Sequence, residues 1–358
     1  MKLSVATNWD EVLIQELRDL PIHDFFGAVP SNVFGGGRPS LILPDVDESK
    51  AEEYIQKVHK SGKKFTYPLN APCLNNMEYD DKGHQELLDH LGWLQDIKVD
   101  YVTVSIPYIV EIIKKQFPKL KVKVSVISHV NSVQRIKSWE DLGADIITVD
   151  PMYNRNFKLL ESLSKAASCE LELLLNDACL YQCPYLYYHY NICGHASQST
   201  NPLKGFYVDY CITKCSLDLF SDLKEVIKSR WIRPEDLERY EEIGINYFKI
   251  SGRRMSTKWL LNTAKAYSSR SYDGSLSDLL NFITIGVDDD MSSGQFQKYL
   301  TKDEFFKKEK LIKIGQLNPP KPYIDNKKLQ GFLKGFEKKD CASECETCHY
   351  CENWAKKV

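Results

Sequence analysis

The stretch that decides the fold is VKVSVISHVNSVQRIKSWEDLGADIITV, residues 122–149. Its first part, residues 122–128, alternates apolar and polar side chains, which is typical of a strand with one buried face. Residues 132–142 then place apolar side chains at helical spacing, and a turn at residues 143–145 leads into the apolar run 146–149. Strand, helix and strand in this order predict a β–α–β unit, whose two strands run parallel.

The same alternation recurs through residues 1–300, so that six or more such units are expected. Further strands are predicted at residues 2–7, 41–43, 64–70, 101–106, 170–175 and 246–250, and helices at 10–20, 48–61, 85–95, 108–116, 157–167 and 234–243. A parallel sheet of this size either stays open as a doubly wound fold or closes into a barrel.

Polar residues that follow directly after the predicted strands favour the barrel. They are Asn8, Asn70, Ser105, His129, Asp150, Asn176 and Ser251. In a barrel all of these strand ends converge on one face, where such enzymes carry out their chemistry. The prediction is therefore an α/β chain with a TIM-barrel-like (β/α)8 parallel barrel and a cysteine-rich C-terminal extension.

Composition excludes several broad classes of protein. Of the 358 residues, 43% are hydrophobic and 27% charged, which is typical of a globular chain with a sizeable core. The formal net charge of −2 gives no overall attraction to nucleic acid or anionic membranes. No window approaches the ~20 apolar residues that a membrane-spanning helix needs, so no membrane span is expected.

The eleven cysteines, with no secretion signal at the N-terminus, indicate a reducing compartment. We therefore expect a cytoplasmic protein in which clustered thiols bind metal and do not form disulfides.

A change in composition predicts two regions, a barrel at residues 1–300 and an appended segment at residues 301–358. The segment 302–339 is rich in lysine and carries interleaved aromatic residues, among them Phe305, Phe306, Phe332 and Phe336. A solvated helix face explains this pattern first, and a surface that follows RNA phosphates explains it second.

The first group of cysteines is two C-x₃-C pairs, Cys179 with Cys183 and Cys211 with Cys215. Four thiolates can hold an iron–sulfur cluster or a structural zinc ion. Because Cys179 follows a strand, the group is expected at the barrel mouth, which favours a redox cluster. Cys193 lies between the pairs and can replace one ligand.

The second group is Cys341, Cys345, Cys348 and Cys351, with spacing C-x₃-C-x₂-C-x₂-C. Because so short a segment has little core of its own, these cysteines are not expected to pack as small hydrophobic residues in a core. The spacing is the reverse of a bacterial ferredoxin run. A second cluster is favoured here, with zinc as the alternative.

Several stretches together resemble the collagenase-like peptidase family U32. They are residues 65–73 (FTYPLNAPC), 145–150 (DIITVD), 176–184 (NDACLYQCP), 189–191 (HYN) and 247–253 (YFKISGR). The resemblance covers roughly residues 1–300. It implies a TIM-barrel-like fold, a [4Fe–4S] cluster held by cysteines and a role in oxygen-independent hydroxylation of a ubiquinone precursor or of a base in transfer or ribosomal RNA.

Three functional hypotheses follow. The leading one is an iron–sulfur oxidoreductase that hydroxylates, or similarly modifies, a small aromatic substrate or an RNA base. The second is a non-catalytic electron-transfer or scaffold subunit beside a catalytic U32 homologue or an electron donor, favoured by Ser251 where the family has Glu and by the added C-terminal cysteines. The third is a zinc-stabilised hydrolase or peptidase.

Candidate residues beyond the cysteines come from the strand ends and from the loop near the first cysteine group. Lys249 and Arg253 flank a late strand and can hold a carboxylate or phosphate, and His189 can transfer a proton near neutral pH. These three are the predicted catalytic residues. Asn70, His129 and Asn176 are predicted to bind substrate. Five tyrosines crowd the loop, Tyr181, Tyr185, Tyr187, Tyr188 and Tyr190, and are expected to shield the cluster.

Overall fold

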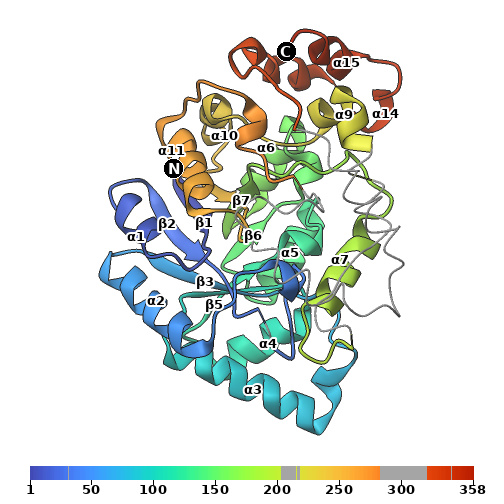
Figure 1. Ribbon diagram of the computed structural model, residues 1–358. Coiled ribbons are helices and arrows are strands. Elements are labelled where there is room, and N and C mark those ends of the chain that lie inside the picture. The colour runs from blue at the N-terminus through green and yellow to red at the C-terminus, as the bar shows by residue number, and fades with distance from the viewer. Residues whose placement is uncertain (31, 203–214, 216–217, 283–320, 340) are drawn as a thin grey trace, which may run out of the picture.

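Eight parallel strands close into a barrel and follow one another around it in chain order, from β1 to β8 (Figure 1). They are β1 (Lys2–Ala6), β2 (Ile22–Phe26), β3 (Lys64–Leu69), β4 (Tyr101–Val104), β5 (Lys121–Val124), β6 (Ile146–Thr148), β7 (Glu170–Leu174) and β8 (Tyr247–Ile250). Pairing of Leu3 with Phe248 is part of the β1–β8 ladder that closes the ring. This computed structural model describes residues 1–30, 32–202, 215, 218–282, 321–339 and 341–358, and it confirms the predicted (β/α)8 fold.

Helices cover the outside of the barrel (Figure 1). The described ones are α1 (Val12–Glu16), α2 (Glu48–Lys60), α3 (Asp81–Asp96), α4 (Pro107–Gln116), α5 (Val133–Asp141), α6 (Phe157–Ala166), α7 (Leu186–Ala196), α9 (Leu223–Lys228), α10 (Leu237–Glu241), α11 (Thr257–Ser269), α14 (Cys341–Glu344) and α15 (Tyr350–Ala355). Short 3₁₀ turns join them: η1 (Ser40–Ile42), η2 (Met77–Tyr79), η3 (Val126–Ser128), η4 (Pro151–Tyr153), η5 (Pro234–Asp236), η6 (Leu276–Asp278), η7 (Lys327–Leu329) and η8 (Leu333–Lys338).

The surface-helix pattern explains why these segments fold as they do. In α2, Ala51, Tyr54, Ile55 and Val58 lie on one face and are buried against the sheet side. The helix begins after Asp47, whose carboxylate accepts a hydrogen bond from the Lys50 backbone N–H and so satisfies an unpaired group at the helix start.

The second strand was not predicted from the sequence. It is β2, whereas the predicted strand at residues 41–43 is wrong, because residues 40–42 form the 3₁₀ turn η1. The reason lies in Asp24, a fully buried carboxylate in the middle of β2 that breaks the apolar pattern of a strand. The predicted strand at residues 122–128 ends earlier, at Val124, and continues as the turn η3.

The C-terminal segment shares the core of the barrel where the structure describes it. Ile324, Leu329 and Phe332 are buried in the same cluster as the barrel helices, and Phe332 stacks on Trp231 with ring centres 5.4 Å apart. Phe332 and Phe336 are therefore core residues and offer no surface for stacking RNA bases. The predicted boundary near residue 300, together with Phe305 and Phe306, lies outside the described residues.

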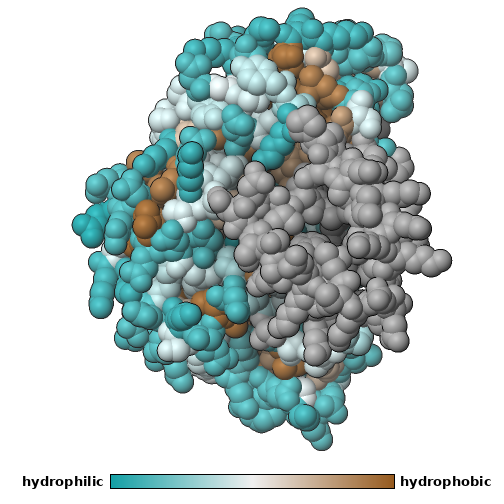
Figure 2. Space-filling view, in the orientation of Figure 1, coloured by the Kyte–Doolittle hydropathy of each residue, from teal (hydrophilic) through white to brown (hydrophobic). Residues whose placement is uncertain are grey.

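The face of the molecule in Figure 2 is mostly hydrophilic where it is described, and its apolar side chains form small separate groups. In the described ranges, no helix combines the length and apolar character needed to span a bilayer.

Candidate active site at the barrel mouth

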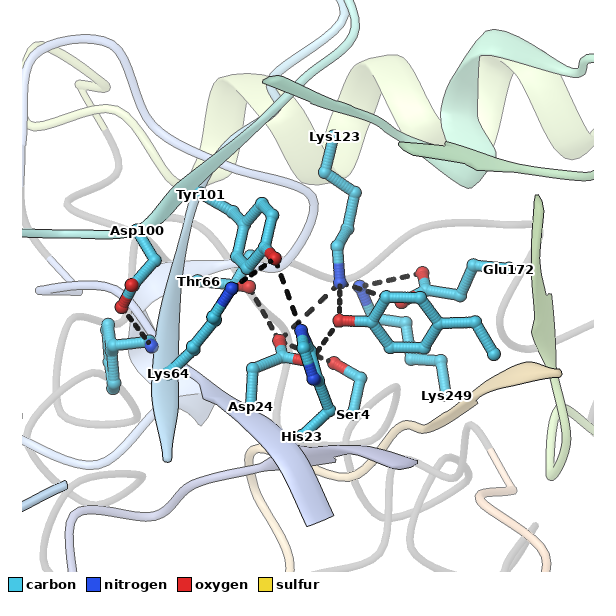
Figure 3. A network of polar contacts seen from close by, with 12 residues as sticks. Ser4, His23, Asp24, Lys64, Thr66, Asp100, Tyr101, Lys123, Glu172 and Lys249 are labelled. Atoms are coloured by element: carbon cyan, nitrogen blue, oxygen red, sulfur yellow. Dashed lines mark hydrogen bonds and ion pairs between the residues drawn. The ribbon is translucent and has the colours of Figure 1, made fainter. Parts of the chain in front are cut away.

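A network of charged side chains fills the inside of the barrel (Figure 3). Lys123 of β5 is fully buried, and its ammonium lies 2.7 Å from Glu172 of β7 and 3.5 Å from Asp24 of β2. Lys123 also donates to the Tyr247 hydroxyl at 3.3 Å. The inside of such a barrel is commonly packed with branched apolar side chains, so a buried ion network is a departure that sequence patterning did not reveal.

The carboxylate of Asp24 stays charged inside this network. Burial alone would raise its pKa, but the positive charge of Lys123 and hydrogen bonds from Thr66 and Tyr247 bring the pKa below its ordinary value. Ser4 donates a further hydrogen bond at 2.9 Å. Two carboxylates face Lys123, so one negative charge is left over, and the second cation of the network is Lys249 beside Glu172.

Lys249, a predicted catalytic residue, lies next to this network. Its ammonium is 3.8 Å from Glu172 and 4.2 Å from the centre of the Phe26 ring. Burial lowers the pKa of Lys249 to about 8, with the carboxylate of Glu172 opposing the shift and the charges of Lys123 and Arg253 adding to it. A lysine in this range can release or accept a proton near neutral pH.

Arg253, the second predicted catalytic residue at the end of β8, has a second arginine near it. Burial, and then the positive charge of Arg38, lower the pKa of Arg253 to about 9. Within the described residues, the Arg253 guanidinium has neither a hydrogen bond nor an ion pair to a side chain. Arg38 comes from the glycine-rich loop after β2, and its guanidinium donates to the Gly37 carbonyl at 3.0 Å. Two guanidinium groups near one barrel mouth form a ready site for a carboxylate or phosphate.

The Cys179 thiol of the first cysteine group lies near Arg38 and Asp177. Burial raises the pKa of Cys179 well above its ordinary value, and Asp177, which accepts a hydrogen bond from this thiol, raises it further. The sulfur of Cys215 is near enough to act electrostatically on Cys179. Cys183 packs with Cys179 against a small apolar cluster that includes Leu186. Cys211 lies outside the described residues.

Cys193, the proposed substitute ligand, lies on α7 beside the predicted proton carrier His189. The Cys193 sulfur and the His189 Nε2 are 3.5 Å apart, and both residues are buried. Arg38 acts electrostatically on both Cys193 and Cys179. The geometry thus brings Cys179, Cys183, Cys193 and Cys215 into one region beyond the end of β7.

His129, a predicted substrate-binding residue, lies in the same region with one ring nitrogen free. Its Nδ1 is 3.2 Å from the Asp150 carboxylate, and its ring centre is 4.4 Å from that of Tyr187. Its Nε2 is buried and has no hydrogen-bond partner in the part of the chain that the structure describes. A ring nitrogen placed in this way can bind a polar substrate group.

The two predicted substrate-binding asparagines hold the backbone at the mouth. The Asn70 amide accepts from the Gly37 N–H at 3.0 Å and donates to Ser125 at 2.8 Å, which fixes the glycine-rich loop that carries Arg38. Asn176 accepts from the Ser251 N–H at 2.9 Å and donates to the Ser251 carbonyl at 3.0 Å, which ties the ends of β7 and β8 together.

The second cysteine group lies elsewhere, on the barrel side near α9 (Figure 1). Cys341, Cys345, Cys348 and Cys351 line one cavity of about 140 Å³, whose charged lining includes Lys224, Lys228, Arg230, Glu346 and Glu352. As placed, no three Cys, His, Asp or Glu side chains of the described ranges lie close enough to hold a single metal ion.

Sequence reasoning missed Asp24, Lys123 and Arg38. A lysine in the middle of an otherwise apolar strand, as in VKV at residues 122–124, was the available signal for the buried network. The sequence contains no such signal for Arg38, because only the folded chain brings its loop to the end of β7.

Comparison with known proteins agrees with this architecture. The profile of the family described as Peptidase family U32 matches residues 44–274. A protein of Methanocaldococcus jannaschii named "Uncharacterized protease MJ1657" is 30% identical over 329 residues, which is 90% of this chain and 85% of that protein. The solved structure of "the U32 Peptidase Mk0906" is similar with a TM-score of 0.52 and 22% identity, covering 70% of this chain and 92% of that one, and it supports the fold. The extent of the profile match and of the archaeal relative shows that this chain belongs to peptidase family U32.

Proposed function

We propose that this protein is an iron–sulfur-dependent oxidoreductase that hydroxylates, or similarly modifies, an anionic aromatic or nucleobase substrate without molecular oxygen. The observation that carries the proposal is the juxtaposition at the barrel mouth of Arg38 with the thiols of Cys179 and Cys193. This arrangement places an anion site beside a set of soft metal ligands.

The residues present suit an iron–sulfur cluster by their chemistry. Cys179, Cys183 and Cys215, with Cys193 or Cys211 as the fourth, would hold it, since thiolates are the usual ligands of such clusters. When bound, a cluster supplies one-electron chemistry or, with only three thiolates, an iron with an open position. With a cluster bound, Arg38 would offset the negative charge of the thiolates. In the metal-free protein these groups are neutral thiols, because burial raises the pKa of Cys179 and Cys183.

The remaining side chains bind and orient the substrate. Arg253 and Arg38 hold its carboxylate or phosphate, because guanidinium groups bind such anions through charge-assisted hydrogen bonds, and Arg253 has no carboxylate partner among the described residues. Lys249 holds or gives up a proton at its ammonium nitrogen, as its lowered pKa allows. The apolar side chains of Ile127, Met152 and Leu186, which pack with Cys179 and Cys183, exclude water from the thiols.

Purification without oxygen, followed by iron, sulfide and zinc analysis, tests the cofactor. We expect C179S to lose about four iron and four sulfide per chain relative to the natural protein. Equal iron content in both proteins, or zinc in place of iron, would remove the basis of the proposal. Mass spectrometry of RNA and quinones from a deletion strain then identifies the modified class, and unchanged RNA and quinones would count against the enzyme.

A thiol hydrolase is the second candidate, and the pair Cys193 and His189 favours it. A cysteine sulfur 3.5 Å from an imidazole nitrogen is the arrangement that activates a thiol nucleophile, and the relatives named above carry the words protease and peptidase. If this reading holds, C193S abolishes peptide hydrolysis while the iron content stays unchanged. If Cys193 is instead a metal ligand or a packing residue, the natural protein does not hydrolyse peptides.

A further inference from the structure

Two buried arginines lie beside the C-terminal cysteines, and neither forms an ion pair with a carboxylate of the described residues. Arg155 and Arg230 are 3% and 5% exposed. Arg155 donates to the backbone carbonyls of Ile227 at 2.8 Å and Trp231 at 3.2 Å. The Nε and one terminal nitrogen of Arg230 are buried without a hydrogen-bond partner in the described part of the chain.

Such an arrangement is costly unless something negative is present. Burying an unpaired cation is unfavourable, and two like charges side by side add to this cost. An anion next to both guanidinium groups would remove it.

Glu346 and Glu352 also line the cavity, but Glu352 is paired with Lys356, and neither forms an ion pair with Arg155 or Arg230 in the described part of the chain. The four cysteines are the other groups there that can supply negative charge. Cys345 and Cys351 lie near enough to Arg230 to interact with it electrostatically, and Arg155 acts in the same way on Cys351. As free thiols they are mostly protonated, and so neutral, near neutral pH. They become anionic when they bind a metal, since a metal-bound thiol is deprotonated.

The size of the cavity indicates a group larger than one ion. Its volume of about 140 Å³ is roughly ten times the ~10–15 Å³ that a single water molecule requires. Four thiolates around a doubly positive [4Fe–4S] core leave a net charge of about −2, which two arginines balance.

We propose that Cys341, Cys345, Cys348 and Cys351 hold an iron–sulfur cluster whose negative charge is balanced by the buried side chains of Arg230 and Arg155. Arg230 is held in place by stacking, with its guanidinium carbon 3.6 Å from the centre of the Tyr181 ring and 5.7 Å from that of Phe336. Tyr181 lies between Cys179 and Cys183 in the chain, so its stacking on Arg230 connects the second site to the central cysteine loop.

The inference does not depend on the central site, and the experiment separates the two. Full-length C179S/C183S and C345S/C348S are purified without oxygen and analysed for iron, sulfide and zinc, with circular dichroism confirming the fold. We expect C179S/C183S to retain about four iron and four sulfide per chain, and a third variant with all four substitutions to lose them. Zinc in place of iron in C179S/C183S would overturn the proposal, and so would unchanged iron in the variant with all four substitutions.

Charge balance is tested by the reduction potential of the cluster in the C179S/C183S protein, titrated with dithionite and a viologen mediator. Each cluster gains one electron and each reductant equivalent loses one. R230Q removes a neighbouring positive charge, so the reduced cluster becomes less favourable and the potential falls. We expect a shift on the order of tenfold in the ratio of reduced to oxidised cluster, which is about 59 mV for one electron.

Lys224→Gln is the matched control, since Lys224 lines the same cavity but is already paired with Asp222 at 3.1 Å. It should shift the potential far less than R230Q, and R230K, which keeps the charge, should stay near the parent value. Equal shifts in R230Q and K224Q would contradict the role given to Arg230.

Discussion

Arg253 carries its charge where both burial and a neighbouring guanidinium oppose it. The same opposition gives the residue its use, because an anion placed against it removes the cost. A charged side chain that lowers the stability of the fold and has no partner of opposite charge is typical of a binding residue. Arg253 is therefore the residue at which anion recognition is most directly measured.

Replacing Arg253 by glutamine should weaken anion binding. A hydrogen bond to a charged group contributes about 1.5–3 kcal/mol, which corresponds to a loss of about tenfold to a hundredfold in affinity. Benzoate serves as a simple aromatic carboxylate, and its binding is measured from the rise in Tm that it gives. Arg270→Gln, a change at an exposed arginine paired with Glu241, is the control and should leave binding intact. Equal benzoate affinity in both variants would exclude Arg253 from the site.

The pH dependence of stability reports on Lys249. Its pKa falls from 10.5 in the unfolded chain to about 8 in the fold, so between these values the unfolded chain binds more protons and the stability due to this group rises with pH. The variant K249M removes the titrating group. Its free energy of unfolding should exceed that of the natural protein at pH 7 and lose that advantage by about pH 10, with a total change on the order of 3 kcal/mol. Denaturant unfolding at several pH values measures the difference, and a difference constant with pH would refute the shift.

At the scale of single elements, the segment around η8 joins the C-terminal cysteines to the barrel. Phe332 packs against Trp231, Phe336 and Tyr350, and the Tyr350 hydroxyl donates to the Phe332 carbonyl at 2.7 Å. This cluster holds α15 against the barrel and so places its cysteine beside Arg155 and Arg230. Packing of one aromatic cluster thus determines the position of the second cysteine group.

Truncating Phe332 should destabilise the protein and disturb the second cysteine group. F332A removes a fully buried aromatic ring, for which a loss of about 3–5 kcal/mol is usual. Denaturant unfolding measures the loss, and Tyr323→Ala, at a side chain 67% exposed, is the matched control with little expected effect. If the two variants unfold with the same free energy, the aromatic cluster does not hold the segment.

The elements themselves were predictable to different degrees. Regular apolar spacing predicted seven of the eight strands at nearly the right place, because branched apolar residues fill the outer face of each. β2 was missed since Asp24 occupies a central position and its charge is compensated by Lys123, which comes from a strand far along the chain. Propensity rules contain no information about such a partner.

At the scale of the whole molecule, closure of the barrel makes the site. It brings Arg38 from the loop after β2, Lys249 from β8, Arg253 from the loop after β8 and the thiols after β7 to one end, although these residues are far apart in the chain. The sequence predicted that polar strand ends would share a face, and this is confirmed for His129, Asn70 and Asn176 in the described structure. It did not predict that both asparagines bind the backbone, because hydrogen-bond partners depend on loop geometry.

The cysteine spacing carried the rest of the functional prediction. Motif spacing shows which thiols can cooperate but not which charges surround them, so the role of Arg38, Arg155 and Arg230 became apparent only from the folded chain. Arginines accompany both cysteine groups, a partly buried Arg38 at the first and the buried Arg155 and Arg230 at the second.

Iron held by the sulfur atoms of the loop after β7 would scatter anomalously, so crystals grown without oxygen are measured at the iron absorption edge. We expect a strong iron peak at the barrel mouth, bounded by the sulfurs of Cys179, Cys183 and Cys215. A zinc peak there, or ordered thiols with no anomalous peak between them, would overturn the proposed cluster.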